Sequence, residues 1–202
     1  MVVSRKNHNP SIARRILRDL KRGESPEKLI STAKEISDPY YSALGLTYIA
    51  SIGLLERPKS EKLLKLVFSN TDKVEQSWRR LELLGEISKR LKNISDEKLK
   101  EIQYKQILKI LISEKKERVK DFFVKNAKNF PASVLDSLLT NSLKLKGYEF
   151  ESSKAVIRNW VGNKPIDKLV KILSSEEGDL RIKLLGYLHF QLNKSKIPRD
   201  QS

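Results

Sequence analysis

The segment Ser25-Pro26-Glu27-Lys28-Leu29-Ile30 combines the features of a helix N-terminus with the start of an apolar stripe. Proline is favoured in the first helical turn, because the N–H that it lacks has no partner within the helix there. Glu27 adds a negative charge where the helix dipole is positive. The segment therefore predicts a helix that begins near Pro26 and buries Leu29.

Similar starts follow along the chain, near Pro58, Asp96, Pro131 and Pro165. The first leucines after the five starts are Leu29, Leu63, Leu99, Leu135 and Leu169, at intervals of 34, 36, 36 and 34 residues. Four of the five follow an acidic residue and a lysine. A period in this range is typical of two-helix repeats that stack into a solenoid.

Apolar residues between these starts keep the helical period, and no segment alternates as a strand does. We expect an all-α solenoid of about five antiparallel helix pairs, preceded by a capping helix near 11–22, or about eleven helices. The second helices of the pairs are predicted at about 39–54, 72–91, 115–129, 149–162 and 179–193. Residues 11–193 are predicted to be a single repeat domain, flanked by mobile polar tails at 1–10 and 194–202.

This spacing and apolar pattern resemble those of the HEAT-like repeat family over about residues 25–193. Tetratricopeptide repeats are the alternative, since Leu44-Gly45-x-x-Tyr48 matches their Leu-Gly-x-x-Tyr core. Leu84-Gly85 and Leu185-Gly186 repeat the pair, but Ser88 and His189 stand where the tyrosine belongs. The HEAT-like resemblance implies a right-handed stack with a long concave binding surface. Some HEAT-like proteins, which form the DNA alkylation repeat family, hold duplex DNA in a basic groove, and some members of that family are glycosylases. Those enzymes use acidic and aromatic residues at fixed places in the groove, and no matching set of residues is found in this sequence.

The composition excludes several kinds of site. The chain of 202 residues contains no cysteine, which excludes disulfides, thiolate metal sites and cysteine nucleophiles and is consistent with a reducing compartment. His8 and His189 form no metal-binding pair, and no nucleotide-binding or hydrolase motif occurs. We therefore expect a cytoplasmic protein that is not an enzyme and has no cofactor. The longest uncharged run, Pro39–Leu55, is too short and polar to cross a membrane, and the N-terminus is not a signal peptide.

Positive charge is the strongest functional signal. Lys and Arg number 41 against 25 Asp and Glu, a net charge of +16. The abundance of Lys and Glu with one Met resembles a hyperthermophile composition, so part of this charge would serve stability. Basic residues also cluster, with seven against one acid in residues 1–22. The candidate residues for an anionic ligand are Arg14, Arg15, Arg18, Lys21, Arg22, Arg79, Lys120, Lys154, Arg158 and Lys183.

Two functions remain open at this level. The first is a non-enzymatic scaffold that binds a protein partner through its solenoid surface. The alternative is a nucleic-acid-binding protein that contacts the phosphate backbone without sequence specificity. We expect Trp78, Phe68, Phe122 and Phe123 in the core, and Trp160 at the joint to the next repeat rather than stacked on a base. The uncharged helix at Pro39–Leu55 is expected to be enclosed by its neighbours, with a partner interface as the alternative.

Overall fold

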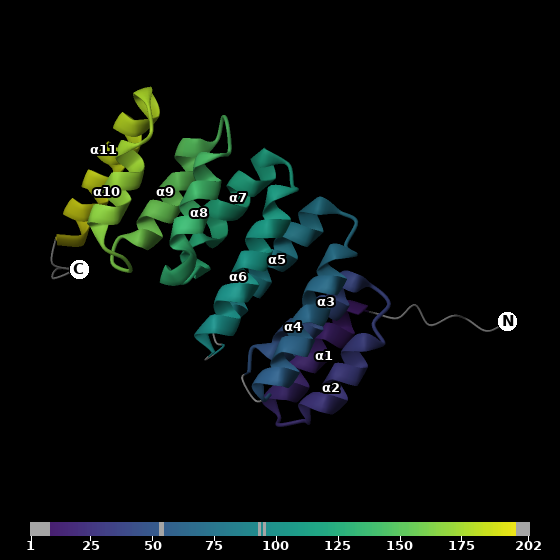
Figure 1. Ribbon diagram of the computed structural model, residues 1–202. Helices are drawn as coiled ribbons and strands as arrows, with labels where there is room; N and C mark the ends of the chain where they lie inside the picture. Colours follow the sequence, from purple (N-terminus) through teal and green to yellow (C-terminus); the bar gives the residue numbers. More distant parts are fainter. Residues whose placement is uncertain (1–8, 53–54, 93, 95, 197–202) are drawn as a thin grey trace, which may run out of the picture. The chain divides into compact units, whose positions relative to one another are not determined.

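The computed structural model describes residues 9–52, 55–92, 94 and 96–196, and Figure 1 shows its helices in chain order. This part of the chain contains eleven α-helices, two short 3-10 helices and no strand. The predicted all-α class and the predicted number of helices are therefore confirmed. None of these helices is both long and apolar enough to cross a bilayer.

Short connections join the successive helices. Their bounds are α1 Asn9–Lys21, α2 Pro26–Lys34, α3 Pro39–Ala50, α4 Arg57–Asp72, α5 Ser77–Leu91, α6 Glu97–Ile112, α7 Lys116–Asn126, η1 Ala127–Asn129, η2 Ala132–Val134, α8 Leu135–Leu143, α9 Glu149–Trp160, α10 Ile166–Ser174 and α11 Gly178–Lys196. The chain divides into two compact units, residues 1–103 and 104–202, and the division falls inside α6. Each unit is described by itself below.

In unit 1 the uncharged helix α3 is the central element. It packs against α1, α2, α4 and α5. Leu46, Ile49 and Ala43 are almost fully buried there, and Thr47 satisfies its hydroxyl by donating to the Ala43 carbonyl at 2.7 Å. The predicted enclosure is confirmed for most of α3, whereas Tyr41, Leu44 and Tyr48 on one face are only partly buried.

In unit 2 the central element is α9, which packs against α7, α8, α10 and α11. Val156, Ile157 and Trp160 are fully buried. Trp160 lies at the end of α9, and its indole Nε1–H donates to the Pro165 carbonyl at 3.0 Å, just before α10. The prediction that Trp160 caps this joint is confirmed, since the bond satisfies the one polar group of a buried indole.

The five starts predicted near Pro26, Pro58, Asp96, Pro131 and Pro165 agree with the structure to within four residues. All five of the leucines that follow these starts, Leu29, Leu63, Leu99, Leu135 and Leu169, are buried. One predicted boundary is wrong. The helix predicted to begin near residue 72 begins at Ser77 instead, because α4 continues to Asp72. The reason is Val74, a buried residue that extends the apolar stripe of α4 into the connection. The helices also extend into the tails predicted at 1–10 and 194–202, because α1 begins at Asn9 and α11 reaches Lys196. The rest of both predicted tails, residues 1–8 and 197–202, lies outside the described residues.

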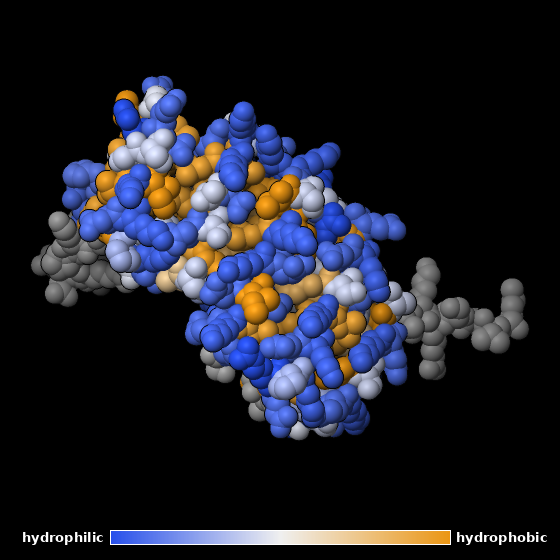
Figure 2. Space-filling view, in the orientation of Figure 1, coloured by the Kyte–Doolittle hydropathy of each residue, from blue (hydrophilic) through white to orange (hydrophobic). Residues whose placement is uncertain are grey.

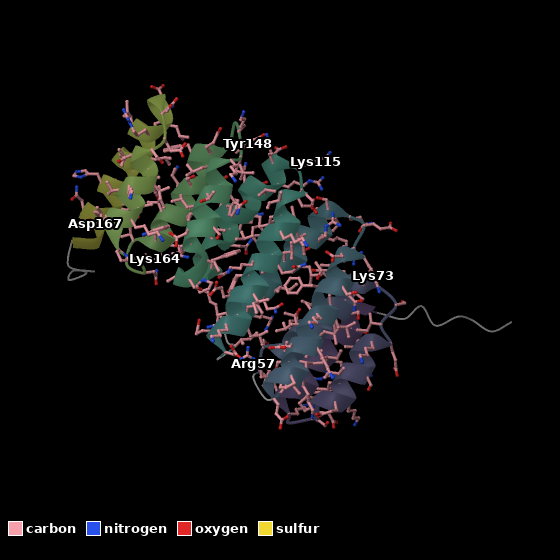
Figure 3. The ribbon with its side chains drawn as sticks, viewed as in Figure 1. Arg57, Lys73, Lys115, Tyr148, Lys164 and Asp167 are labelled. Carbon is pink, nitrogen blue, oxygen red and sulfur yellow. The ribbon has the colours of Figure 1, made fainter. Side chains whose placement is uncertain are left out.

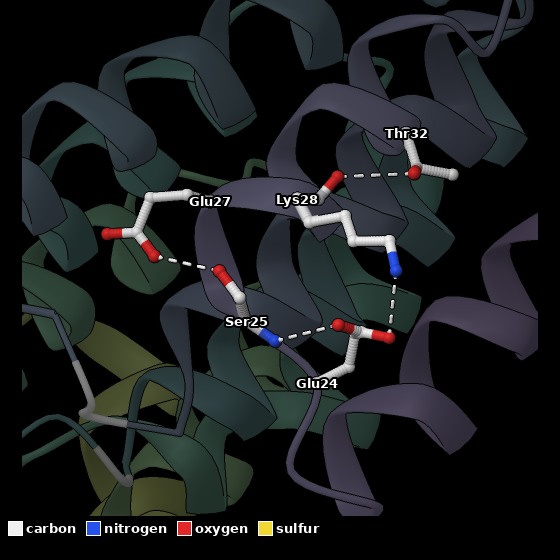
Figure 4. Close-up of polar contacts among 5 residues, drawn as sticks. All are labelled: Glu24, Ser25, Glu27, Lys28 and Thr32. Atoms are coloured by element: carbon white, nitrogen blue, oxygen red, sulfur yellow. Dashed lines mark hydrogen bonds and ion pairs between the residues drawn. The ribbon is translucent and has the colours of Figure 1, made fainter.

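Helix starts are stabilised by different means. Asp38 and Asp96 act as N-caps, and each accepts a backbone N–H at 2.9 Å, from Tyr40 and Leu99 respectively. Ser25 makes no such bond at α2; its hydroxyl donates to Glu27 at 3.2 Å, while Lys28 donates to Glu24 at 3.0 Å (Figure 4). At α2 two acidic residues, Glu24 before the cap position and Glu27 in the first turn, therefore place negative charge at the helix N-terminus without a side-chain cap.

Charged side chains cover most of the surface, and Figure 2 shows hydrophilic residues over much of the face in view, with apolar atoms between them. Most ion pairs are local, and a few link separate elements. Arg57, labelled at the start of α4 in Figure 3, pairs with Glu61 and also with Asp96, both at 3.1 Å. In unit 2 Lys164, labelled in the same figure, pairs with Asp136 of α8 and lies 4.9 Å above the Trp160 ring.

Asp136 should make the stability of unit 2 depend on pH. Burial raises the pKa of its carboxyl, but hydrogen bonds and charge from Lys164 and Lys168 outweigh burial and lower the pKa overall. The stabilisation is thus complete above the pKa of the unfolded chain, about 4, and is lost as the pH falls through the lower folded value. We expect Asp136→Asn to destabilise the protein at pH 7, with a difference from wild type that shrinks below about pH 4. Urea unfolding at pH 7 and below about pH 4 measures this difference in the free energy of unfolding. Asp167 is exposed, so Asp167→Asn should behave as wild type in both conditions.

Candidate functional site

The odd-numbered helices of unit 1 form a pocket of about 290 Å³. It is lined by aromatic and charged side chains from α1, α3 and α5: Arg14, Tyr40, Tyr41, Tyr48, Trp78, Arg79 and Glu82, with Pro10, Ala13 and Leu44. We call it the α1/α3/α5 pocket. Its helices contact one another in the order α1, α3, α5, so the pocket lies on a continuous layer of three helices.

Arg79 builds one wall of this pocket. Its guanidinium donates to Asp38 at 2.9 Å and lies 4.7 Å from the ring centroid of Tyr40 and 5.5 Å from that of Tyr41. Burial, followed by the negative charge of Glu82, raises the pKa of Tyr40 to about 12, so this phenol is neutral at pH 7. Because Asp38 neutralises Arg79 and the Arg79 side chain is only 22% exposed, this predicted anion-binding residue is a structural part of the wall.

Tyr48 lies deeper along α3 in a similar environment. The Arg90 guanidinium is 4.2 Å from its ring centroid, a distance at which a cation is attracted to the face of the ring. Burial raises the pKa of Tyr48, against the opposing charges of Arg90 and Arg14. The influence of Arg14 on this phenol places the α1 arginine close to the aromatic part of the pocket.

The predicted basic helix is α1, and its cationic side chains are exposed while Ala13, Ile16 and Leu20 are buried. Of the five predicted residues, Arg14 is the one that lines the pocket. Arg18 pairs with Asp19 at 3.7 Å and stays 60% exposed. Arg15 and Lys21 are exposed on α1, and Arg22 is exposed just after its end. The five basic residues predicted on this helix therefore form one exposed basic surface, which lies beside the pocket.

Unit 2 carries a second surface of this kind, which we call the α7/α9/α11 face. Lys120 of α7 lies 5.6 Å from the ring of Tyr148, which is labelled just before α9 in Figure 3. Lys154 of α9 lies 5.0 Å from Phe150 and 5.6 Å from Tyr187 of α11. Arg158 donates to the Tyr187 hydroxyl at 3.1 Å. Three of the predicted basic residues thus share aromatic neighbours on consecutive helices of one layer.

Acidic side chains pair with two of the cations of this face. Lys120 pairs with Asp121 at 2.9 Å and Lys154 with Glu151 at 3.2 Å. The hydrogen bond that Lys120 donates to Asp121 is the main cause that raises the pKa of Lys120, so its ammonium is charged at pH 7. Arg158 and Lys183 are exposed. Lys183 lines a shallow hollow of about 360 Å³ together with Tyr148 and Phe150, and three acidic residues, Glu149, Glu151 and Asp179, line it as well.

The prediction that Trp78 lies in the core is wrong, because its side chain is 59% exposed. Phe68, Phe122 and Phe123 are buried as predicted. The helical period of α5 explains the difference: Trp78 is four residues from Glu82, and both lie on the exposed face, whereas Leu81 and Leu84 lie on the buried one. Counting from Glu82 rather than from the leucines would have assigned Trp78 to the surface.

Among the described residues no group of three histidine or carboxylate side chains could hold a metal ion. His189 shares a hydrogen bond of 2.9 Å with Asn193, and His8 lies outside the described residues. The arrangement of the two surfaces suits a ligand that carries negative charge and planar rings. No family model matches the chain, and no curated protein or solved structure matches it significantly.

Proposed function

We propose that this chain is a non-enzymatic helical-repeat protein that binds nucleic acid at the odd-numbered helices of each unit. The observation that carries the proposal is the interleaving of cations and aromatic rings on α1, α3 and α5 in unit 1 and on α7, α9 and α11 in unit 2. Basic side chains attract the phosphate backbone, and each exposed ring offers a stacking surface for a base.

The cations on the α7/α9/α11 face are held in place before any ligand arrives. Lys154 lies near two rings, and the Tyr187 hydroxyl accepts from Arg158. Long side chains that are already positioned lose less conformational entropy when they bind a phosphate. Arginine also grips phosphate oxygens in a bidentate manner. This preorganisation favours phosphate binding over a merely solvated charged face.

We also propose that the helix pairs are HEAT-like repeats, with tetratricopeptide-like repeats as the alternative. The neighbour order within each unit supports this, because α1, α3 and α5 contact in sequence, as do α7, α9 and α11. Burial of the five leucines that follow the predicted helix starts, including Leu29 and Leu169, is consistent with equivalent positions in successive repeats. In such stacks one layer of helices lines a continuous binding surface.

Nucleic-acid binding should weaken as salt rises, and the basic surface of α1 should account for part of that dependence. We expect Arg14→Ala, Arg18→Ala and Arg22→Ala together to lower the slope of log affinity against log salt by roughly 2–3 units, because about three phosphate contacts are lost. The measurement is the anisotropy of labelled single-stranded RNA and random duplex DNA at several salt concentrations.

The matched control removes the same charge elsewhere in unit 1. Lys62, Lys65 and Lys73 are exposed on or next to α4, and their triple alanine variant should keep the wild-type slope. An affinity weaker than about 100 µM at physiological salt, the weak limit of non-specific nucleic-acid binding, would contradict the proposal. Equal slopes for the two triple variants would also contradict it.

A protein partner is the second candidate, supported by apolar side chains that remain exposed. On α11, Ile182 is 68% exposed and Phe190 is 58% exposed. They lie eight residues apart, about two helical turns, and therefore share one face. Large exposed apolar residues on one face are typical of protein-binding surfaces. Affinity capture from a lysate with and without nuclease separates the candidates, because a protein partner persists after the nucleic acid is digested.

A further inference from the structure

The α1/α3/α5 pocket contains an indole that the fold leaves uncovered. Trp78 lines the pocket and is 59% exposed, and among the described residues no ring or cation is recorded against it. Tyr40 and Tyr41, by contrast, are covered by Arg79. The pocket volume of about 290 Å³ is near the lower end of the roughly 300–1,000 Å³ range of ligand pockets. One flat ring can therefore enter and stack on Trp78.

An acceptor lies next to this stacking surface. Glu82 follows Trp78 by one turn of α5, lines the same pocket and is exposed. An ionised carboxylate only accepts hydrogen bonds. The ring that suits it must therefore present N–H groups along one edge. Guanine alone among the common bases presents two adjacent donors, N1–H and N2–H, on its Watson–Crick edge, and can bind both carboxylate oxygens.

The third element is a cation on the opposite side of the pocket. Arg14 of α1 lines the pocket, is exposed and has no ion-pair partner among the described residues. It is free to bind a phosphate of the strand that carries the base. A cationic ligand would leave Arg14 without a partner, whereas a nucleotide offers a phosphate to Arg14 and ring N–H groups to Glu82.

We propose that the α1/α3/α5 pocket binds a guanine of a single-stranded nucleic acid, with Trp78 stacking on the base, Glu82 accepting from its Watson–Crick edge and Arg14 binding the adjacent phosphate. This rests on the proposed function and adds to it both a strand type and a base preference. A duplex is excluded from the pocket, since a paired guanine has its N1–H and N2–H occupied and both faces stacked.

The test compares labelled oligothymidylate with the same oligonucleotide carrying one central guanine. The wild-type chain should bind the guanine-containing strand more tightly by roughly 5- to 150-fold, the range for one bidentate base contact. Trp78→Ala should weaken its binding by a similar factor, the usual effect of losing one stacking surface, and Trp78→Phe should restore part of it. Because Trp78 is exposed, its removal should leave thermal unfolding unchanged.

Glu82→Gln separates recognition from folding. It should abolish the guanine preference and at the same time strengthen binding of plain oligothymidylate, because a negative charge near the phosphates is removed. The control is Glu75→Gln, which changes an exposed acid in the connection before α5. It should change neither the affinity for oligothymidylate nor the preference for the guanine-containing strand. Equal affinity of the wild-type chain for the two strands, with salt-dependent binding retained, would overturn the guanine site and leave the proposed function standing. No binding to either strand would overturn both.

Discussion

Replacing Trp160 by alanine should lower the free energy of unfolding by about 3–5 kcal/mol, the range for truncating a large buried aromatic residue. Trp160 is fully buried at the end of α9, and its indole N–H bonds to the Pro165 carbonyl. The substitution leaves a cavity and an unpaired carbonyl at the joint between α9 and α10. Urea unfolding monitored by circular dichroism measures the change, and a loss under about 1 kcal/mol would contradict the assigned role.

Two variants divide this effect into its parts. Trp160→Phe keeps most of the apolar volume and loses the hydrogen bond, so it should cost about 1–3 kcal/mol. Trp78→Ala removes the same side chain from an exposed position and should change stability by no more than about 0.5 kcal/mol. The contrast between two tryptophans tests burial directly, because the chemistry of the two deletions is identical.

Replacing Gly45 by leucine should destabilise unit 1 by roughly 3 kcal/mol, at the upper end of the effects of overpacking. A Cβ at this buried position on α3 would lie 3.0 Å from Ile16 Cδ1 of α1 and 3.5 Å from Ala33 Cβ of α2. Both neighbours are buried, so the additional leucine carbons can only be accommodated if α1 or α2 moves. Thermal unfolding should show a lower midpoint for this variant.

Gly186 provides the matched control, since it also follows a leucine inside a helix. A Cβ there would meet nothing within 4 Å. We expect Gly186→Leu to be neutral or to stabilise α11 by up to about 1 kcal/mol, because leucine has the higher helix propensity. Destabilisation of both glycine variants by the same amount would show that the close packing at Gly45 is not the cause.

The helices were predictable because their signals are local. Proline, aspartate and glutamate at a helix start act through the backbone within one turn, and a buried leucine such as Leu63 follows from the apolar period. The end of α4 was not predictable from the same signals. Asn70-Thr71-Asp72 has the composition of a turn, but Thr71 is fully buried and donates to the Val67 carbonyl at 2.8 Å. Packing against neighbouring helices therefore overrides local preference there.

The candidate site was predictable as a charge pattern and not as a pocket. The sequence shows that Arg14 and Arg79 are basic, but it does not show that Asp38, 41 residues before Arg79, neutralises one of them. The aromatic neighbours were missed for the same reason, since Lys154 and Tyr187 are far apart in the chain and meet only when α9 and α11 pack. Contacts between helices determine which charges remain available to a ligand.

The placement of the two tryptophans also gives each compact unit its own optical reporter. The sequence contains two tryptophans, Trp78 and Trp160. The first belongs to unit 1 and the second to unit 2. An indole in water emits at longer wavelength than a buried one, and dissolved iodide quenches only the exposed indole. The emission of Trp160 should therefore follow the unfolding of unit 2, while quenching of Trp78 follows occupation of the unit 1 pocket. One unlabelled sample can thus report both the unfolding of unit 2 and the binding of a ligand in unit 1.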